Sequence, residues 1–465
     1  AGNLMVYGAQ DSGADALVAT LVYALAQKLD ARALNLYIAD LGQGVLAPFA
    51  TLPQCGGVVL QGEQERMVNL FRLLEGEVER RRKLLVPYGG FIDAYCAATG
   101  EALPSIVCAI TNLASFYEIY APLEDRLNAL TRDAVRYGIH FIVTATSAMT
   151  PRMRLKANFA RVLACFMNDE NDYVTVFGRR PQVLPAHVPG RGVVELDKEV
   201  LEFQAASYAG EDTPAQEVLG ELAAKTVAVS PVVAPPIPAL PDRVTRGELP
   251  AMSLDAVPVG FSKRSIEPVG FPFSKSPYML VLGNDAEGIG RYLRGVWEFM
   301  AHDPAAIDLE GMLAPFADDE RIASNEEDAA RLLRMVMCGA QDCRVLIFTS
   351  IAQTMTKLPA IEAKSLQDYI VGEQAVGKTG VIAASELWRV RQAYDPWWKS
   401  LSAYGNGVWV GNGMSDQTVF RMSQASAEYR QTLPRSEGFC VLRGAIEGVR
   451  LIEAVDEPQD EAQTS

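Results

Sequence analysis

Two glycine-containing stretches have the spacing of phosphate-binding loops. The first runs Gly8-Ala9-Gln10-Asp11-Ser12-Gly13-Ala14-Asp15, between apolar residues 4–7 and an apolar run from 16 to 26. The second, Gly283-Asn284-Asp285-Ala286-Glu287-Gly288-Ile289-Gly290, follows residues 278–282 and repeats both glycines at one offset. In the working motif G-x-x-x-x-G-K-[ST], backbone amides cradle phosphates, the Lys neutralises charge and the hydroxyl holds Mg²⁺. The repeat predicts two related strand–loop–helix units.

The first loop lacks the side chains that handle phosphate. Ala14 and Asp15 stand where the motif needs Lys and Ser or Thr, and Asp11 adds further negative charge. At a separation of about 4 Å and an effective dielectric near 20, the interaction between one such charge and a phosphate charge is worth up to ~4 kcal/mol before solvation. Asp15 could still coordinate Mg²⁺, and bare amides still favour an anion. Occupation of this site by ATP with Mg²⁺ therefore stays open.

The second loop is degraded further. Ile289 and Gly290 replace the Lys and the hydroxyl, and Asp285 and Glu287 repel phosphate. We expect this site to be empty.

The strands that should supply catalytic carboxylates also lack them. A working site carries Asp-Glu at the end of a neighbouring strand (the Walker B position), one residue for Mg²⁺ and one to activate water. Here the strand before residue 111 runs into Thr111 and Asn112, and its counterpart runs into Thr349 and Ser350. We therefore assign no catalytic residue in either unit, and whether the chain is an enzyme stays open.

Composition narrows the classes of partner. The chain has 465 residues, 49% of them hydrophobic and 21% charged, which suits two globular domains. A formal charge of −15 argues against nucleic acid as a partner.

Seven scattered cysteines and only three histidines (His140, His187 and His302) suggest neither a disulfide framework nor a metal site, and favour a reducing cytosol. No apolar run is long enough to span a bilayer. The start at Ala1, close to a buried strand, suggests a piece of a longer protein whose membrane anchor lies upstream.

Apolar strands alternate with amphipathic helices, so we expect an α/β fold with mostly parallel sheets covered on both faces. In such sheets ligands gather at the carboxyl ends of strands, where the first loop, Thr111, Asn112 and Ser147 should meet. The expected domains are 1–229 and 230–465, the second beginning with a proline-rich linker at 230–250 and ending in a disordered tail from 456. The expected strands are 34–40, 56–60, 105–112, 139–147, 162–166, 173–177, 192–196, 344–350, 379–385 and 407–411.

A helix is predicted between 63 and 85, and it ends in the basic cluster Glu79-Arg80-Arg81-Arg82-Lys83. A solvated helix end and a phosphate or partner site both explain that cluster. The aromatic segment Trp388–Tyr404, with adjacent Trp397 and Trp398, likewise has two interpretations, interface anchors or core.

Several further segments, taken together, cover nearly the whole chain. They are Glu79-Arg80-Arg81 before residues 88–95, Tyr137-Gly138-Ile139-His140 leading to Ser147, 156–162, Pro189-Gly190-Arg191-Gly192, 267–271 and 274–278. This combination resembles the FtsK/SpoIIIE family of RecA-like motor ATPases, and within it the last two ATPase domains of the EssC/EccC group of type VII secretion. The alternative, a tight turn in an unrelated α/β protein, leaves the duplication unexplained.

The resemblance implies two tandem RecA-like (P-loop NTPase) domains in a hexamer-forming motor, on the cytoplasmic side of the membrane that anchors it. It implies an active ATPase domain upstream and recognition of helical WXG-type secretion substrates. Arg161 matches an arginine that family members present to a neighbour's nucleotide; a surface salt bridge is the other interpretation. We expect a non-hydrolysing or weakly nucleotide-binding segment that regulates the upstream domain. The rivals are an active ATP-driven DNA translocase and a conjugative coupling protein.

Overall fold

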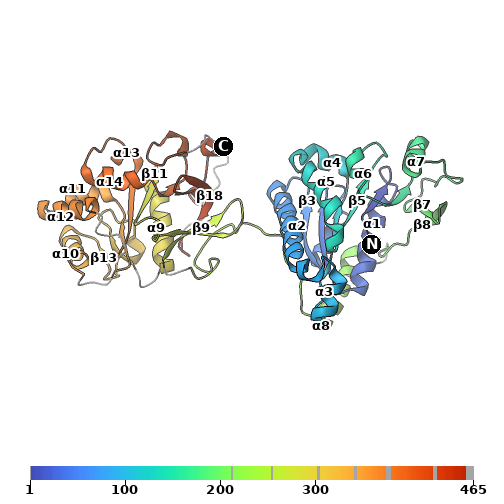
Figure 1. Ribbon diagram of the computed structural model, residues 1–465, viewed down its shortest axis with the longest axis horizontal. Coiled ribbons are helices and arrows are strands. Elements are labelled where there is room, and N and C mark those ends of the chain that lie inside the picture. The colour runs from blue at the N-terminus through green and yellow to red at the C-terminus, as the bar shows by residue number, and fades with distance from the viewer. Residues whose placement is uncertain are drawn as a thin grey trace. The chain divides into compact units, whose positions relative to one another are not determined.

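The computed structural model describes residues 2–210, 213–252, 255–300, 304–339, 343–372, 379–422 and 427–456. His302 lies outside these ranges. The tail beyond residue 456, for which we expected disorder, also lies outside them. The chain divides into two compact units, Ala1–Ala239 and Leu240–Ser465 (Figure 1). Among the residues that the structure describes, no helix combines the length and apolar character needed to cross a membrane.

The first unit is built on an eight-stranded sheet in the order β3-β2-β4-β5-β1-β6-β7-β8. Six strands pair in parallel, while β7 and β8 extend one edge in antiparallel fashion. Strand β2 is buried along its whole length, as expected for a parallel strand covered on both faces. The strands are β1 (Leu4–Tyr7), β2 (Leu34–Asp40), β3 (Cys55–Leu60), β4 (Ser105–Ile110), β5 (Ile139–Ala145), β6 (Arg161–Cys165), β7 (Arg191–Leu196) and β8 (Glu199–Gln204).

Helices cover both faces of this sheet (Figure 1). One core packs α1 (Ala14–Lys28) and α8 (Ala215–Val229) against the sheet, and the other packs α2 (Gln64–Leu85), α4 (Leu113–Ile119) and α5 (Glu124–Asp133). The other α-helices of this unit are α3 (Ile92–Thr99), α6 (Met153–Lys156) and α7 (Glu170–Phe177).

The strand expected at 173–177 is wrong, because these residues belong to α7. The Asp169 side chain accepts a hydrogen bond from the Asn171 amide and begins the helix. Tyr173, Val176 and Phe177 pack in the core at helical spacing, whereas Val174 is exposed. Local capping therefore overrides the strand preference of these β-branched residues.

The second unit contains a ten-stranded sheet in the order β10-β9-β18-β17-β16-β11-β15-β14-β12-β13. Its half from β16 to β13 is parallel, and the other half is antiparallel. The strands are β9 (Ala256–Ser262), β10 (Pro268–Pro272), β11 (Tyr278–Gly283), β12 (Pro304–Ile307), β13 (Ile322–Ala323), β14 (Val345–Phe348), β15 (Gly380–Glu386), β16 (Gly407–Val410), β17 (Glu437–Leu442) and β18 (Ala445–Leu451).

The helices of the second unit are divided unevenly between the two faces. Helix α9 (Ala286–Met300) packs on one face, and the remaining helices pack on the other. These are α10 (Glu326–Met337), α11 (Ile351–Lys357), α12 (Ala360–Val371), α13 (Leu387–Val390) and α14 (Pro396–Tyr404). Both units are thus α/β domains with mostly parallel sheets.

The proline-rich segment is held by the first unit over its first part. The Ala234 amide donates to the Pro53 carbonyl, and the Ile237 amide donates to the Gly56 carbonyl at the β3 edge. Ala234 and Ile237 are buried. Residues 230–239, which we expected to belong to the second domain, therefore pack on the first.

Candidate functional sites

The first loop is folded as a phosphate-binding loop would be. It connects β1 to α1, and Gly13 precedes the helix with φ at 82°. The loop is tied to the sheet, because the Gly8 amide donates to Ala145 and the Ala9 amide to Phe166, at 3.0 and 2.7 Å. A Cβ on Gly13 would lie 2.2 Å from the Gly190 nitrogen, so only glycine fits. The segment containing Pro189-Gly190 thus closes over the loop.

The side chains of this loop offer little to a phosphate. Gln10 and Asp11 are exposed, whereas Ala9 and Ala14 are buried and apolar. Ser12 is fully buried, and its hydroxyl finds no hydrogen-bond partner. The loop therefore keeps its backbone shape without a cation at position 14.

Asp15 occupies the position of the metal-binding hydroxyl, and its carboxylate is already engaged. Thr144 Oγ1 donates to Asp15 Oδ1 at 2.9 Å. A Cβ on Gly42 would lie 2.8 Å from Asp15 Oδ2 and 3.8 Å from Asp40 Oδ1, so both carboxylates flank this glycine. Burial raises the pKa of Asp15; the hydrogen bond from Thr144 opposes that rise and the charge of Asp40 adds to it.

Thr111 and Asn112 lie at the same edge but are committed to structural contacts. Thr111 Oγ1 donates to Asp40 Oδ1 at 3.0 Å and accepts from the Leu41 amide at 2.9 Å. Asn112 Oδ1 accepts from the Ser115 amide at 3.3 Å and begins α4. The Asn112 amide donates to Thr144 Oγ1 at 2.8 Å. At this edge Asp40 thus binds Thr111, and Thr144 links Asp15 to Asn112.

The sequence patterns did not identify Asp40 and Thr144 as residues of this site. Asp40 is the last residue of β2, so its position at the carboxyl end of a predicted strand could have indicated it. Thr144 lies within β5, and no feature of the sequence indicates it.

The residues present do not fit ATP with Mg²⁺ in the manner of the working motif. Position 14 supplies no cation, and the carboxylate at position 15 is held by Thr144 beside a second carboxylate. Within the part of the chain that the structure describes, no three His, Cys, Asp or Glu residues form a group that could hold a metal ion.

Arg161 is the first residue of β6 and lies opposite Leu4 at the start of β1. It is therefore at the amino edge of the sheet, away from the loop of its own unit. The side chain is exposed, and no ion pair joins it to another described residue. A surface salt bridge is thus not its role in this structure.

The basic cluster at the end of α2 separates into two kinds of side chain. Arg82 and Lys83 are exposed and pair with Glu79, as expected of a solvated helix end. Arg81 is fully buried, and it donates to the Tyr137 and Pro104 carbonyls and to Glu77, each at 2.7 Å. It therefore ties α2 to the segments that lead into β4 and β5.

The second loop is not formed. In the first unit, α1 begins directly after Gly13, the second glycine of the loop. In the second unit, α9 already begins at Ala286, before the corresponding Gly288. Neither Gly283, Gly288 nor Gly290 has the positive φ of Gly13. Residues 286–290 are helical, so the loop expected at 283–290 is wrong from Ala286 onward.

The side chains of this stretch are used within the fold. Asp285 Oδ2 accepts from the Gly288 amide at 3.2 Å and pairs with Arg435 Nε at 2.6 Å. Glu287 pairs with Arg294 at 2.7 Å. Asn284 Nδ2 donates to the Asn412 carbonyl, and Ile289 is buried in the core. Both acids that we expected to repel phosphate are thus countered by arginines.

Thr349 and Ser350 follow β14 at the carboxyl edge. Thr349 Oγ1 donates to Asp308 Oδ1 at 2.7 Å. Ser350 precedes α11, and its buried hydroxyl has no hydrogen-bond partner. As in the first unit, a hydroxyl replaces the expected carboxylate and binds an aspartate from the neighbouring strand end.

The aromatic segment 388–404 divides into core and surface. Trp397 and Trp398 are each 6% exposed and fill the core, whereas Trp388 is 66% and Tyr394 79% exposed. A cavity of about 430 Å³ lies between α11, α12 and the start of α14, and Trp397 is the one aromatic residue of this segment that lines it. Its walls include Met355, Ala363, Lys364, Arg389, Asp395 and Trp397. The exposed aromatics of this segment are therefore Trp388 and Tyr394, and not the adjacent pair.

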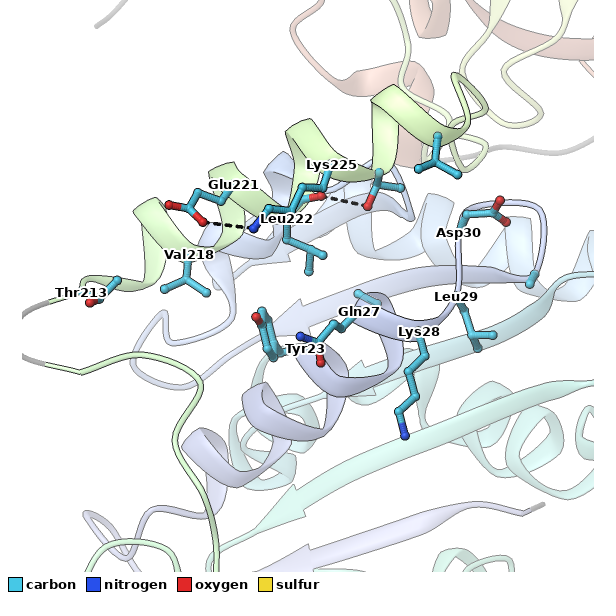
Figure 2. A pocket seen from close by; sticks show the side chains of 14 residues that line it. Tyr23, Gln27, Lys28, Leu29, Asp30, Thr213, Val218, Glu221, Leu222 and Lys225 are labelled. Atoms are coloured by element: carbon cyan, nitrogen blue, oxygen red, sulfur yellow. Dashed lines mark hydrogen bonds and ion pairs between the residues drawn. The ribbon is translucent and has the colours of Figure 1, made fainter.

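Another cavity, of about 600 Å³, lies between α1 and α8 in the first unit (Figure 2). Leu222 extends from α8 toward Tyr23 on α1, and the Glu221–Lys225 ion pair stays on α8 (Figure 2). None of residues 8–15 lines this cavity, so it is separate from the first loop.

Known proteins resemble this chain in sequence. Residues 1–191 match the FtsK/SpoIIIE family. The ESX secretion system protein YukB of Bacillus subtilis (strain 168) is 26% identical over 319 residues, which are 65% of this chain and 21% of YukB. The ESX-4 secretion system protein EccC4 of Mycobacterium tuberculosis (strain H37Rv) is 28% identical over 305 residues, or 63% of this chain and 23% of EccC4. The chain thus spans less than a quarter of the length of these relatives.

Two solved structures share the fold. EssC (ATPases 2 and 3) from Geobacillus thermodenitrificans gives a TM-score of 0.85 at 20% identity, covering 97% of this chain and 91% of that one. Thermomonospora curvata EccC (ATPases 2 and 3), solved in complex with a signal sequence peptide, gives 0.61 at 20% identity, covering 97% and 88%. The resemblance inferred from sequence is confirmed: residues 1–191 match the FtsK/SpoIIIE family, and the chain shares the fold of ATPases 2 and 3 of the type VII secretion proteins EssC and EccC.

Proposed function

We propose that this chain is a non-hydrolysing part of a type VII secretion ATPase, and that its second unit receives a helical segment of a WXG-type secreted protein. The observation that carries the proposal is the pair of exposed aromatics, Trp388 and Tyr394, whose chain neighbours Arg389, Ala393 and Asp395 line the 430 Å³ cavity. Large exposed aromatic side chains next to a cavity are typical anchors of protein interfaces.

The geometry of both degenerate sites supports the absence of hydrolysis. The first loop is shaped for phosphates but has Ala14 and an engaged Asp15 in place of the residues that hold charge and metal. In the second unit, helix α9 replaces the loop itself. A unit that keeps its sheet while losing this chemistry is used for its surface.

The expected binding mode is an amphipathic helix laid in an apolar groove. Met355, Ala363 and Trp397 form the apolar part of the cavity wall, and Lys364, Arg389 and Asp395 belong to its polar part. The exposed rings of Trp388 and Tyr394 add contact area. The relative from Thermomonospora curvata was solved with a signal sequence peptide, which supports a peptide ligand in this group.

In the full-length protein, this segment would follow an active ATPase domain and a membrane anchor, lie on the cytoplasmic side of the membrane, and join a hexamer. Arg161 then approaches a neighbouring subunit, since it is exposed, unpaired among described residues, and distant from its own loop. Substrate binding in the second unit would regulate the upstream domain.

The test uses the full chain and a fluorescein-labelled synthetic peptide that copies the C-terminal helix of a WXG-type protein. Fluorescence anisotropy should show saturable binding, and Trp388→Ala with Tyr394→Ala should weaken it at least about tenfold, as expected of two anchor residues. Phe91→Ala is the matched control, because Phe91 is 70% exposed but belongs to the first unit. Equal affinity of the double variant and the control would remove the second unit from the receptor role.

A second measurement separates this function from an active translocase or a coupling protein. Phosphate release from Mg-ATP should stay at background, with and without double-stranded DNA. DNA-stimulated turnover would overturn the non-hydrolysing assignment.

A further inference from the structure

We propose that Arg389 is a positioning residue, which holds the ring of Trp388 in place for contact with an apolar side chain of the docked segment. This inference rests on the proposed receptor function of the second unit. It assigns a role to a charged group in the wall of the cavity, where an arginine would otherwise suggest recognition of an acidic ligand.

Arg389 is held from two other elements. Its Nη1 lies 2.8 Å from Glu310 Oε1, in the loop after β12, and its Nε lies 2.6 Å from Glu386 Oε2, at the end of β15. The three side chains are only 19%, 16% and 13% exposed. Carboxylates on two edges of a planar guanidinium fix its orientation, which a lysine ammonium cannot reproduce.

This fixed guanidinium lies over the Trp388 ring. Its central carbon lies 4.9 Å from the centroid of the Trp388 ring. That ring is nonetheless 66% exposed, so much of its surface stays open to solvent. The stack therefore anchors a large aromatic side chain that would otherwise sample several rotamers.

Such anchoring favours binding because the ring is ordered before the ligand arrives. Immobilising a mobile side chain on binding lowers affinity, and a ring that is already held avoids this cost. The Trp388 ring, held by an arginine of the cavity wall that Glu310 and Glu386 fix in turn, is thus a preorganised contact.

The local charge decides which ligand group suits this contact. One arginine and two glutamates give this group of three side chains a net charge of −1, and both carboxylates already pair with Arg389. A ligand carboxylate would be repelled by Glu310 and Glu386, whereas an apolar side chain can pack on the exposed part of the indole. The ligand position that meets Trp388 is therefore apolar.

A double-mutant cycle with the labelled WXG-type peptide tests this role in the full chain. Arg389→Met should weaken binding about threefold to tenfold in the native background and should change nothing further in the Trp388→Ala background. Arg389→Lys should not restore the affinity, because it lacks the planar fork. Glu386→Gln, which keeps Arg389 and removes one of its anchors, should give a smaller loss and guards against misfolding of the methionine variant.

The spectroscopic readout is the mobility of Trp388 itself. The difference in time-resolved fluorescence anisotropy between each protein and its Trp388→Phe counterpart isolates this ring, and Arg389→Met should increase its fast motion. A purely structural role would weaken binding equally in both backgrounds and leave this motion unchanged, which would overturn the inference. If Trp388→Ala alone leaves affinity unchanged, the proposed receptor site fails instead.

Discussion

Thr111 Oγ1 donates a 3.0 Å hydrogen bond to Asp40 Oδ1, and the second unit repeats the pair, with Thr349 Oγ1 donating to Asp308 Oδ1 at 2.7 Å. Each threonine follows the strand that would carry the catalytic carboxylates, and each aspartate stands at the end of the neighbouring strand. Both aspartates also accept backbone amides, from Leu46 in the first unit and from Leu313 in the second, each at 2.7 Å. The two units thus share a buried acid–hydroxyl tie where a motor would hold its metal.

This tie predicts a loss of stability without the hydroxyl. Thr111→Val or Thr349→Val removes one of the donors to a buried aspartate oxygen, which keeps only a backbone amide, from Gly42 in the first unit and from Met312 in the second. This loss should cost about 1–3 kcal/mol. Urea denaturation of Thr349→Val can be followed by tryptophan fluorescence, because all five tryptophans belong to the second unit. Circular dichroism follows Thr111→Val. Exposed Thr146→Val is the control, and equal midpoints for Thr111→Val and this control would contradict the prediction.

Repair of the first loop should restore affinity without turnover. Ala14→Lys with Asp15→Thr adds a cation and removes a carboxylate, so affinity for a fluorescent ATP analogue should rise about tenfold or more. Hydrolysis should stay at background, because Thr111 and Asn112 cannot support metal or activate water. Ala16→Lys places the same charge on an exposed position of the same helix and should not restore binding. Turnover in the repaired protein would show that another carboxylate serves as the base.

The pKa of Asp15 predicts a pH-dependent stability. Because burial raises this pKa, the folded state favours the neutral carboxyl, and its contribution to stability is lost as pH rises through the folded pKa. Asp15→Asn keeps an oxygen for Thr144 and removes the ionisation. The variant should therefore be more stable than the native chain at pH 7.5, with a difference that shrinks toward pH ~4, near the pKa of an unfolded aspartate.

Urea midpoints across this pH range give the measurement, and Asp11→Asn, on an exposed neighbour, is the charge control. A gap between Asp15→Asn and the native chain that widens on acidification would mean that Thr144 stabilises the ionised form more than burial disfavours it.

The sequence predicted the α/β class and most parallel strands correctly, since apolar runs such as residues 34–40 match β2 residue for residue. It could not show that α9 starts at Ala286, because Gly283 and Gly288 have loop spacing, whereas the structure keeps Gly283 in β11 and places Gly288 in a helix whose Ile289 packs in the core. The ties of Asp40 to Thr111 and of Arg389 to Glu310 join residues far apart in the chain, so periodicity carries no trace of them. The spacing of apolar residues therefore predicts helices and strands, whereas the side-chain contacts that form the candidate sites join residues distant in sequence and require the structure.

Buried Arg81 and exposed Arg82 should respond very differently to the same substitution. Arg81→Met removes three hydrogen bonds and takes this donor from the buried Tyr137 and Pro104 carbonyls, while Glu77 keeps Arg80, so the loss should be about 3–5 kcal/mol. Arg82→Met should change stability by no more than about 0.5 kcal/mol, since its side chain is 59% exposed. Urea denaturation followed by circular dichroism compares them. Similar midpoints would indicate that the cluster serves a partner and not the fold.

Two helical glycines should give opposite results when replaced by alanine. Gly76 lies within α2 with nothing within 4 Å of an added Cβ, so Gly76→Ala should stabilise the first unit by about 0.5–1 kcal/mol.

Gly295 lies within α9, where an added Cβ would lie 2.7 Å from the backbone nitrogen and Cα of Glu453. Glu453 is buried and pairs with Arg291 at 2.7 Å, so the clash would push the segment after β18 away from this ion pair. Gly295→Ala should therefore destabilise the second unit by about 1–3 kcal/mol despite the better helix propensity of alanine. Tryptophan fluorescence in urea measures this loss, and a stabilised Gly295→Ala protein would show that the segment around Glu453 is free to move away from α9.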